Sequence, residues 1–163
     1  MTGLIANLGS ESFTTMSTVN TKYHDAKLWI THLNEYRALV ALSDADQAFG
    51  TYARHCHDDD WKTYYFKKKY GTLDFNHLPP HAKAEREDRV QASNDALDLH
   101  CETYVDPAAM AAIRLVLTNA PDIDALETKI QIIKKHEFDN YTPMTVDPFA
   151  VITQDVARLR AAQ

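Results

Sequence analysis

The chain has few of the residues that end helices or make tight turns: 163 residues include four glycines and six prolines. Tight β-turns depend strongly on glycine, so a fold built from many hairpins is hard to reach from this composition. Long apolar runs are missing too, since none approaches the ~20 residues that a membrane-spanning helix needs. The N-terminus shows neither the basic start nor the apolar core of a signal peptide. We therefore expect no membrane association.

Cysteine is scarce as well. Cys56 and Cys101 are too few for a disulfide framework, which indicates a reducing, cytoplasmic setting. The formal net charge of −6 argues against wholesale nucleic-acid binding. A content of 45% hydrophobic and 25% charged residues is typical of a globular protein with a core of its own.

Apolar residues recur at helical spacing from Lys22 onward. One face carries residues at alternating spacings of three and four, namely Tyr23, Ala26, Ile30, Leu33, Arg37 and Val40. Trp29, Tyr36 and Leu39 widen this face, and a broad apolar face needs more than one neighbour. Residues 22–57 fit either one helix or two, because Ser43–Asp46 can cap a new start. Residues 1–20 are weakly patterned and are expected to form a flexible N-terminal arm, unless a partner subunit orders them; translation could start at Met1 or at Met16.

The middle of the chain is expected to hold two further helical segments. Residues 58–71 place aspartates in a first turn, Lys67–Lys69 in a last turn and Gly71 at the stop. Pro79-Pro80 then precedes a long helix over 81–105. Its narrow seam consists of Val90, Ser93, Leu97, Cys101 and Tyr104.

The last third carries repeated start signals. Asp106-Pro107 and Asp147-Pro148 each combine a capping acid with proline, and Asn119–Asp122 ends one helix and begins another. Residues 108–117 are apolar except for Arg114, which predicts a helix buried on all sides. Two regular seams follow, one made by Ile123, Leu126, Ile130 and Ile133, the other by Phe149, Ile152, Val156 and Leu159.

These patterns predict an all-α fold, since no segment shows the sustained alternation of a strand. We expect a helical bundle of two long antiparallel helices plus a shorter C-terminal helical hairpin. Residues 21–163 are treated as a single helical domain.

The closing third also carries a resemblance. Pro121, Leu126 and Lys129, followed by Asp155-Val156-Ala157-Arg158-Leu159, resemble the ends of small helical proteins common in bacterial prophage regions. Most of those proteins have no assigned activity. The resemblance implies a phage- or prophage-derived protein and brings no catalytic motif with it.

The most distinctive stretch lies at residues 61–70, which combine aromatic rings with lysines and contain no acid. The candidate binding residues are Trp61, Lys62, Tyr64, Tyr65, Lys67, Lys68, Lys69 and Tyr70. Aromatic faces beside cations suit single-stranded nucleic acid. The interpretation we favour instead buries Trp61, Tyr64 and Tyr65 in a core and turns the lysines to water or to the acidic helix at 81–106.

Metal and catalytic motifs are weak. His55, His57 and Asp59 are the candidate metal ligands, yet residues two apart on a helix point in roughly opposite directions. Cys56 and Cys101 each neighbour a histidine in sequence, which is not the spatial relation that a nucleophile and base need. We expect no metal, no cofactor and no enzymatic activity. The sequence predicts a binding or structural protein that contacts a protein partner or itself, as a homo-oligomer, with nucleic acid as the alternative partner and a histidine-rich metalloprotein as the third reading.

Overall fold

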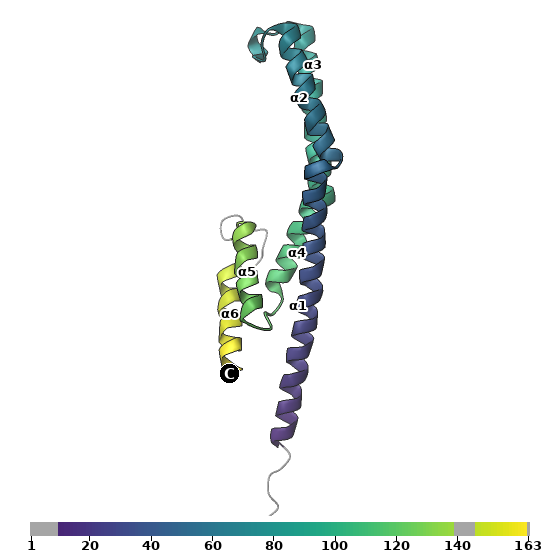
Figure 1. The fold of residues 1–163 in the computed structure, drawn as a ribbon. Coiled ribbons are helices and arrows are strands. Elements are labelled where there is room, and N and C mark those ends of the chain that lie inside the picture. Colours follow the sequence, from purple (N-terminus) through teal and green to yellow (C-terminus); the bar gives the residue numbers. More distant parts are fainter. Residues whose placement is uncertain (1–9, 139–145, 163) are drawn as a thin grey trace, which may run out of the picture. The chain divides into compact units, whose positions relative to one another are not determined.

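The computed structural model describes residues 10–138 and 146–162, with side chains described from Tyr23 onward. Every regular element in these residues is helical and no strand occurs among them, which confirms the all-α prediction. Figure 1 shows α1 (Ser10–Phe49), α2 (Thr51–Tyr70), α3 (Pro80–His100), α4 (Asp106–Leu117), α5 (Ile123–Lys135) and α6 (Pro148–Ala161). The chain divides into two compact units. Unit 1 comprises Met1–Tyr36 with Ala111–Gln163, and unit 2 comprises Arg37–Met110. A single domain over 21–163 stays a prediction.

The first long helical pattern forms two helices. α1 begins at Ser10, earlier than the expected start at Lys22, and ends at Phe49. Residues 1–9 lie outside the described residues, and the flexibility of the N-terminal arm stays a prediction. α2 begins at Thr51, so Asp58–Asp60 lie in its middle and not in a first turn as predicted. Its end is as predicted, because Gly71 has a φ of 76° and Lys67–Lys69 occupy the last turn.

Gly50 separates α1 from α2 for a steric reason. The Asp46 carboxylate lies over Gly50 and accepts a hydrogen bond of 2.8 Å from the Thr51 N–H. A Cβ atom at residue 50 would lie 2.1 Å from Asp46 Oδ1, which is well inside contact distance. Glycine therefore allows Asp46 to cap the new helix from the end of the old one.

Unit 2 is organised by the packing of α2 on α3. Its hydrophobic core contains Phe66, Leu78 and Ala82, with Tyr70 packed against it. A short 3-10 turn at Phe75–His77 lies in the connection between the two helices. The predicted seam of the second long helix is wrong in part, because Val90 and Leu97 are exposed.

α4 begins at Asp106, as Asp106-Pro107 predicted, but the backbone before it does not leave the helical conformation. A π-helical turn at Cys101–Val105 joins α3 to α4, and the Asp106 N–H donates to the Cys101 carbonyl. Proline has no N–H to donate and its ring crowds the preceding turn of a helix. A wider turn just before the proline accommodates both effects, so the chain continues helically.

Unit 1 draws its core from α1, α4 and α5. α1 contributes Trp29 and Tyr36, whereas Tyr23 and Ile30 of the predicted stripe are exposed. The buried apolar residues that α4 and α5 contribute to unit 1 are Ala111, Ala112, Ile113, Leu115, Val116, Ala125, Leu126, Ile132 and Ile133. α5 and α6 contact each other and lie side by side in Figure 1. Asp122 and Asp147 cap these two helices as predicted, although Ile123 and Phe149 at their starts are exposed.

Candidate functional site

The basic aromatic stretch lies on the C-terminal half of α2, and its three leading rings are not buried. Trp61, Tyr64 and Tyr65 have exposed fractions of 52%, 57% and 58%, which contradicts the expectation that they form a core. At 100° per residue, Phe66 and Tyr70 point to the side of α2 that packs on α3. Trp61, Tyr64 and Tyr65 then fall on the opposite side. The predicted face was therefore the wrong one, and Phe66, exposed by only 2%, is the buried ring.

The three exposed rings contact one another. Trp61 stacks on Tyr65 with centroids 6.1 Å apart, and Tyr64 meets the edge of Tyr65 at 5.4 Å. The Trp61 indole N–H also donates a hydrogen bond of 3.1 Å to His57 Nε2. These contacts restrict the rings to one cluster on the surface of α2, here called the aromatic cluster (Trp61, Tyr64 and Tyr65).

The lysines around the aromatic cluster differ in their partners. Lys69 forms an ion pair of 3.0 Å with Glu85 of α3, and the Tyr70 hydroxyl donates to the same carboxylate at 2.8 Å. The hydrogen bonds from Tyr70 and Lys69 lower the pKa of Glu85. Lys62, Lys67 and Lys68 are exposed and make no ion pair with any residue that the structure describes. The predicted pairing with the acidic helix therefore holds for Lys69 alone.

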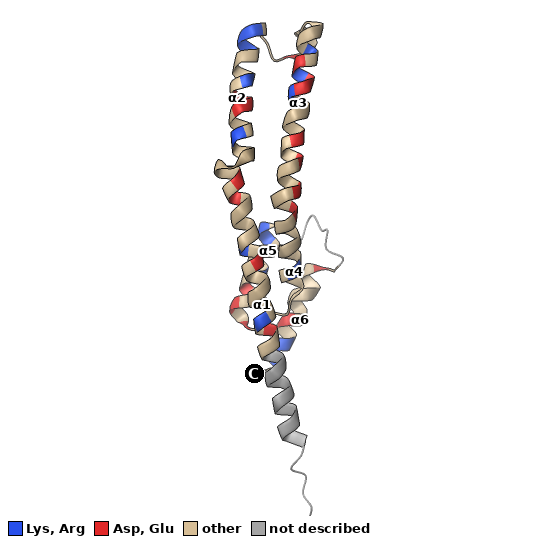
Figure 2. Cartoon of the chain, turned by 90° about the vertical axis from the view of Figure 1, so that its right-hand side faces the viewer, with Lys and Arg blue, Asp and Glu red and all other residues tan. Residues whose placement is uncertain are grey.

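Charge is distributed unevenly over the two helices of unit 2. Figure 2 shows basic residues gathered at the C-terminal end of α2 and acidic residues repeated along α3. Another ion pair between these helices has the reverse polarity, with Arg89 of α3 on Asp59 of α2 at 2.9 Å. The aromatic cluster thus lies beside a basic surface on which only Lys69 forms an ion pair within the described residues.

The candidate metal ligands are not brought together. His57 accepts from Trp61, and Asp59 pairs with Arg89. His55 lines a cavity of about 260 Å³ that neither His57 nor Asp59 lines. No group of three or more potential ligands occurs within residues 23–138 and 146–162. The absence of a stoichiometric metal stays a prediction.

Unit 2 also holds a buried contact between a histidine and a carboxylate that no sequence pattern indicated. His100 Nδ1 lies 2.7 Å from the Asp46 carboxylate, and both residues are buried. Tyr52 stacks on the His100 ring at 4.5 Å. Burial alone would raise the pKa of Asp46, but hydrogen bonds from His100 and from the Thr51 backbone bring it below its usual value. The pair ties the end of α1 to the end of α3, and we assign it a structural role.

A second buried charged group lies in unit 1. Lys129 is fully buried, and its Nζ donates to the Thr118 carbonyl at 2.7 Å and to the Asp155 carboxylate. Arg158 also donates to Asp155, at 3.0 Å, and the Ala120 N–H donates to the same carboxylate at 3.2 Å. Burial lowers the pKa of Lys129, while Asp155 opposes that shift. We call Lys129, Asp155 and Arg158 the buried triad.

No family model, no curated protein and no solved structure matches this chain. The likeness to small prophage proteins therefore stays a prediction. None of the helices in the described residues has the length and apolar character required to cross a membrane.

Proposed function

We propose that the protein is a non-enzymatic helical binding protein that acts through protein–protein contacts, first of all with a second copy of itself. The observation that carries this proposal is the exposure of the aromatic cluster beside three unpaired lysines. Tryptophan and tyrosine are enriched at the energetic centres of protein interfaces because each buries a large area with few rotatable bonds. A contiguous group of such rings on a surface marks an interaction site.

The surface that complements this site is the outer side of α3. Its acidic residues are exposed and lie on the side away from the buried Ala82 and His100; they are Glu87, Asp88, Asp95 and Asp98. Leu99 adds exposed apolar area to this side of α3. A basic surface with apolar rings on one copy suits an acidic surface with an apolar side chain on another, in both charge and hydrophobicity.

This pairing has a consequence for symmetry. The two surfaces lie on different helices of one unit, so one copy presents α2 and the next presents α3. Such a contact is heterologous, and it leads to a closed ring or to a growing chain of copies. The predicted homo-oligomer is therefore expected to depend strongly on protein concentration.

We also propose a helix arrangement, a cellular location and an origin for the protein. The two long antiparallel helices are supported by three side-chain contacts, which join Tyr70 to Glu85, Asp59 to Arg89 and Asp46 to His100. The residue number falls along the first helix as it rises along the second, which is the order that antiparallel helices require. A C-terminal hairpin is supported by the contact of α5 with α6. A cytoplasmic location is supported by two unpaired cysteines, and a phage or prophage origin by the resemblance of the C-terminal third.

Light scattering during size exclusion tests self-association. The wild type is expected to exceed the monomer mass of 18.5 kDa at micromolar concentration. Reversing the basic side (Lys62→Glu, Lys67→Glu, Lys68→Glu) or the acidic side (Asp95→Lys, Asp98→Lys) should each give a monomer. Mixing the two variants should restore a complex, because each still has one intact surface.

The control is Lys134→Glu with Lys135→Glu, which reverses exposed charges on α5 and should leave the mass unchanged. A wild-type mass of 18.5 kDa at every concentration would refute the proposal, as would reversed variants that keep the wild-type mass.

Single-stranded nucleic acid is the second candidate partner, because exposed rings beside free lysines are what stacked bases and phosphates require. Three phosphate contacts would give an affinity that falls with salt at a slope of about −2 on logarithmic axes. Our proposal predicts no binding of a single-stranded oligonucleotide at low salt. Salt-dependent binding that the three lysine reversals abolish would favour the nucleic-acid function instead.

A further inference from the structure

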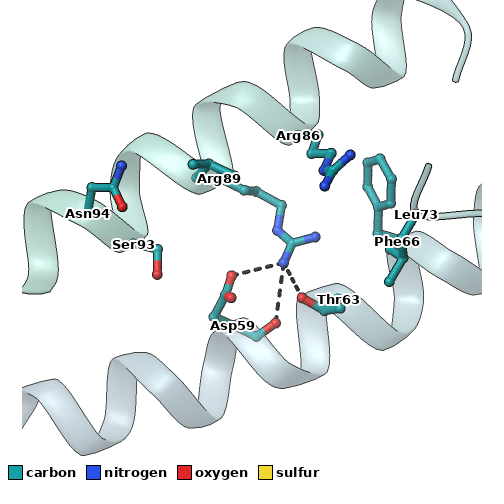
Figure 3. A pocket seen from close by; sticks show the side chains of 9 residues that line it. Asp59, Thr63, Phe66, Leu73, Arg86, Arg89, Ser93 and Asn94 are labelled. Carbon is teal, nitrogen blue, oxygen red and sulfur yellow. Dashed lines mark hydrogen bonds and ion pairs between the residues drawn. The ribbon is translucent and has the colours of Figure 1, made fainter. Parts of the chain in front are cut away.

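A cavity of about 280 Å³ lies between α2 and α3 in unit 2, on the side of α2 opposite the aromatic cluster. Phe66, Leu73 and Val90 give it an apolar wall, and Arg86, Arg89 and Asn94 contribute polar groups. Figure 3 shows both arginines extending from α3 toward α2. The cavity therefore combines two cations with an apolar surface, which is the composition of a small-molecule site.

Arg89 is held in place but is incompletely paired. One terminal nitrogen, Nη2, makes all its hydrogen bonds: to the Asp59 carboxylate at 2.9 Å, the Asp59 carbonyl at 3.3 Å and the Thr63 hydroxyl at 2.5 Å. Its Nε is buried and has no hydrogen-bond partner within the described residues. In Figure 3 the other terminal nitrogen points away from Asp59. A guanidinium has five N–H donors, so Arg89 retains donors for a further acceptor.

Arg86 lies one helical turn before Arg89 and so points to the same side of α3. Its guanidinium carbon lies 5.8 Å from the centroid of the Phe75 ring. It forms no ion pair with a carboxylate in the part of the chain that the structure describes. The residues that line the cavity thus include two arginines and one carboxylate, that of Asp59, which pairs with Arg89. The lining itself carries one positive charge in excess.

We propose that this cavity binds a small organic monocarboxylate with an apolar, ring-sized body. The carboxylate would accept hydrogen bonds from the unused donors of Arg86 and Arg89, whose planar groups suit its two oxygens. One negative charge balances the single excess positive charge, whereas a phosphate dianion would add repulsion from Asp59. The apolar body would lie against Phe66, Leu73 and Val90. This site is separate from the aromatic cluster and does not depend on self-association.

Benzoate is a suitable probe, and benzamide is its neutral counterpart of the same shape. Titration of each into ¹⁵N-labelled protein should be followed at the Nε–Hε signals of the arginines. Benzoate is expected to shift the Arg86 and Arg89 signals in a saturable way, and benzamide should bind at least about tenfold more weakly, since hydrogen bonds to charged groups are the stronger kind.

Arg86→Gln should weaken benzoate binding by about tenfold or more. Arg86→Lys keeps the charge but loses the planar pair of donors, so its affinity for benzoate should lie between those of Arg86→Gln and the wild type. Arg54→Gln makes the same charge change on the exposed surface of α2 and should leave the affinity unchanged. Circular dichroism checks that each variant is folded. Equal binding of benzoate and benzamide would overturn the proposal. So would equal losses in Arg86→Gln and Arg54→Gln, or no saturable shift up to about 10 mM benzoate.

Discussion

Removing the carboxylate of Asp155 should severely destabilise unit 1. Asp155→Ala leaves the Lys129 ammonium fully buried without its counter-ion, and it also removes the acceptor of the Ala120 N–H and one of the two acceptors of Arg158. Breaking a buried ion pair from one side typically costs about 3–5 kcal/mol. We expect the free energy of unfolding to fall by that amount.

The partner change should cost less. Lys129→Met keeps most of the side-chain volume and removes the buried ammonium, while Asp155 retains its hydrogen bonds from Arg158 and Ala120. We expect a loss of about 1–3 kcal/mol, as for a lost hydrogen bond to a charged group. The double variant leaves neither a buried ammonium nor an unpaired carboxylate, so its cost should be lower than the sum of the two single costs by about 2 kcal/mol.

Urea unfolding followed by tryptophan fluorescence measures these losses in unit 1 specifically. The chain has two tryptophans, and Trp29 lies in unit 1 whereas Trp61 lies in unit 2. In a Trp61→Phe background the signal therefore reports Trp29 alone. With a slope of about 2 kcal/mol per molar urea, the Asp155→Ala midpoint should fall by roughly 2 M.

Lys134→Met is the matched control, because it removes an exposed lysine from the same helix and should change stability by less than about 0.5 kcal/mol. A cost below about 1 kcal/mol for Asp155→Ala would show that the triad is open to water. Strict additivity of the two single changes would show that Lys129 and Asp155 do not interact.

Two further outcomes are expected. Gly50→Ala should lower the melting temperature in a calorimetric scan by about 2–6 °C, because the added Cβ displaces Asp46. Gly50→Ser adds the same Cβ and should lower the melting temperature at least as much. Burial, assisted by the charge of Lys135, lowers the pKa of His136. Between the normal histidine pKa of about 6.5 and that lower value, the unfolded chain binds a proton that the folded chain does not, so stability should fall as the pH drops through this window. His136→Gln should flatten that fall in urea titrations at several pH values, and an unchanged slope would contradict it.

Local signals in the sequence were enough to place several helix ends. Gly71, Asp122 and Asp147 each act within one turn of their own helix, through a left-handed backbone or a capping carboxylate. These positions depend little on the rest of the fold, and the structure confirms them. α4 begins at Asp106, where Asp106-Pro107 predicted a start, but the π-helical turn at Cys101–Val105 continues the helix from α3, so the two helices are not separated.

The buried faces were harder to predict, since a helix with apolar residues around much of its circumference offers several adjacent stripes. α1 buries Trp29 and Tyr36, while Tyr23 and Ile30 stay exposed. That choice depends on elements far along the chain: His32 Nδ1 lies 2.7 Å from the Thr118 hydroxyl, and Tyr36 contacts His136. On α2, Trp61, Tyr64 and Tyr65 can tolerate water at their polar atoms, whereas Phe66 has none and is buried.

The buried triad could not be predicted from composition or periodicity. A lysine at a helical position normally indicates the solvent side. Its partner Asp155 lies 26 residues away and also looks like an ordinary surface residue. Only the folded arrangement of α5 and α6 makes the two charges compatible with burial.

The buried pairing of Lys129 with Asp155 predicts which residues must occur together in any chain that shares this fold. A chain with the same fold cannot lose Asp155 alone without leaving the buried Lys129 ammonium without its counter-ion. We therefore expect that, wherever a lysine occupies this position of the penultimate helix, an aspartate occupies the position of Asp155 in the last helix, together with the arginine three residues later. A sequence search can therefore use these three positions together with the two aspartates that cap the last two helices, and it does not need overall sequence similarity.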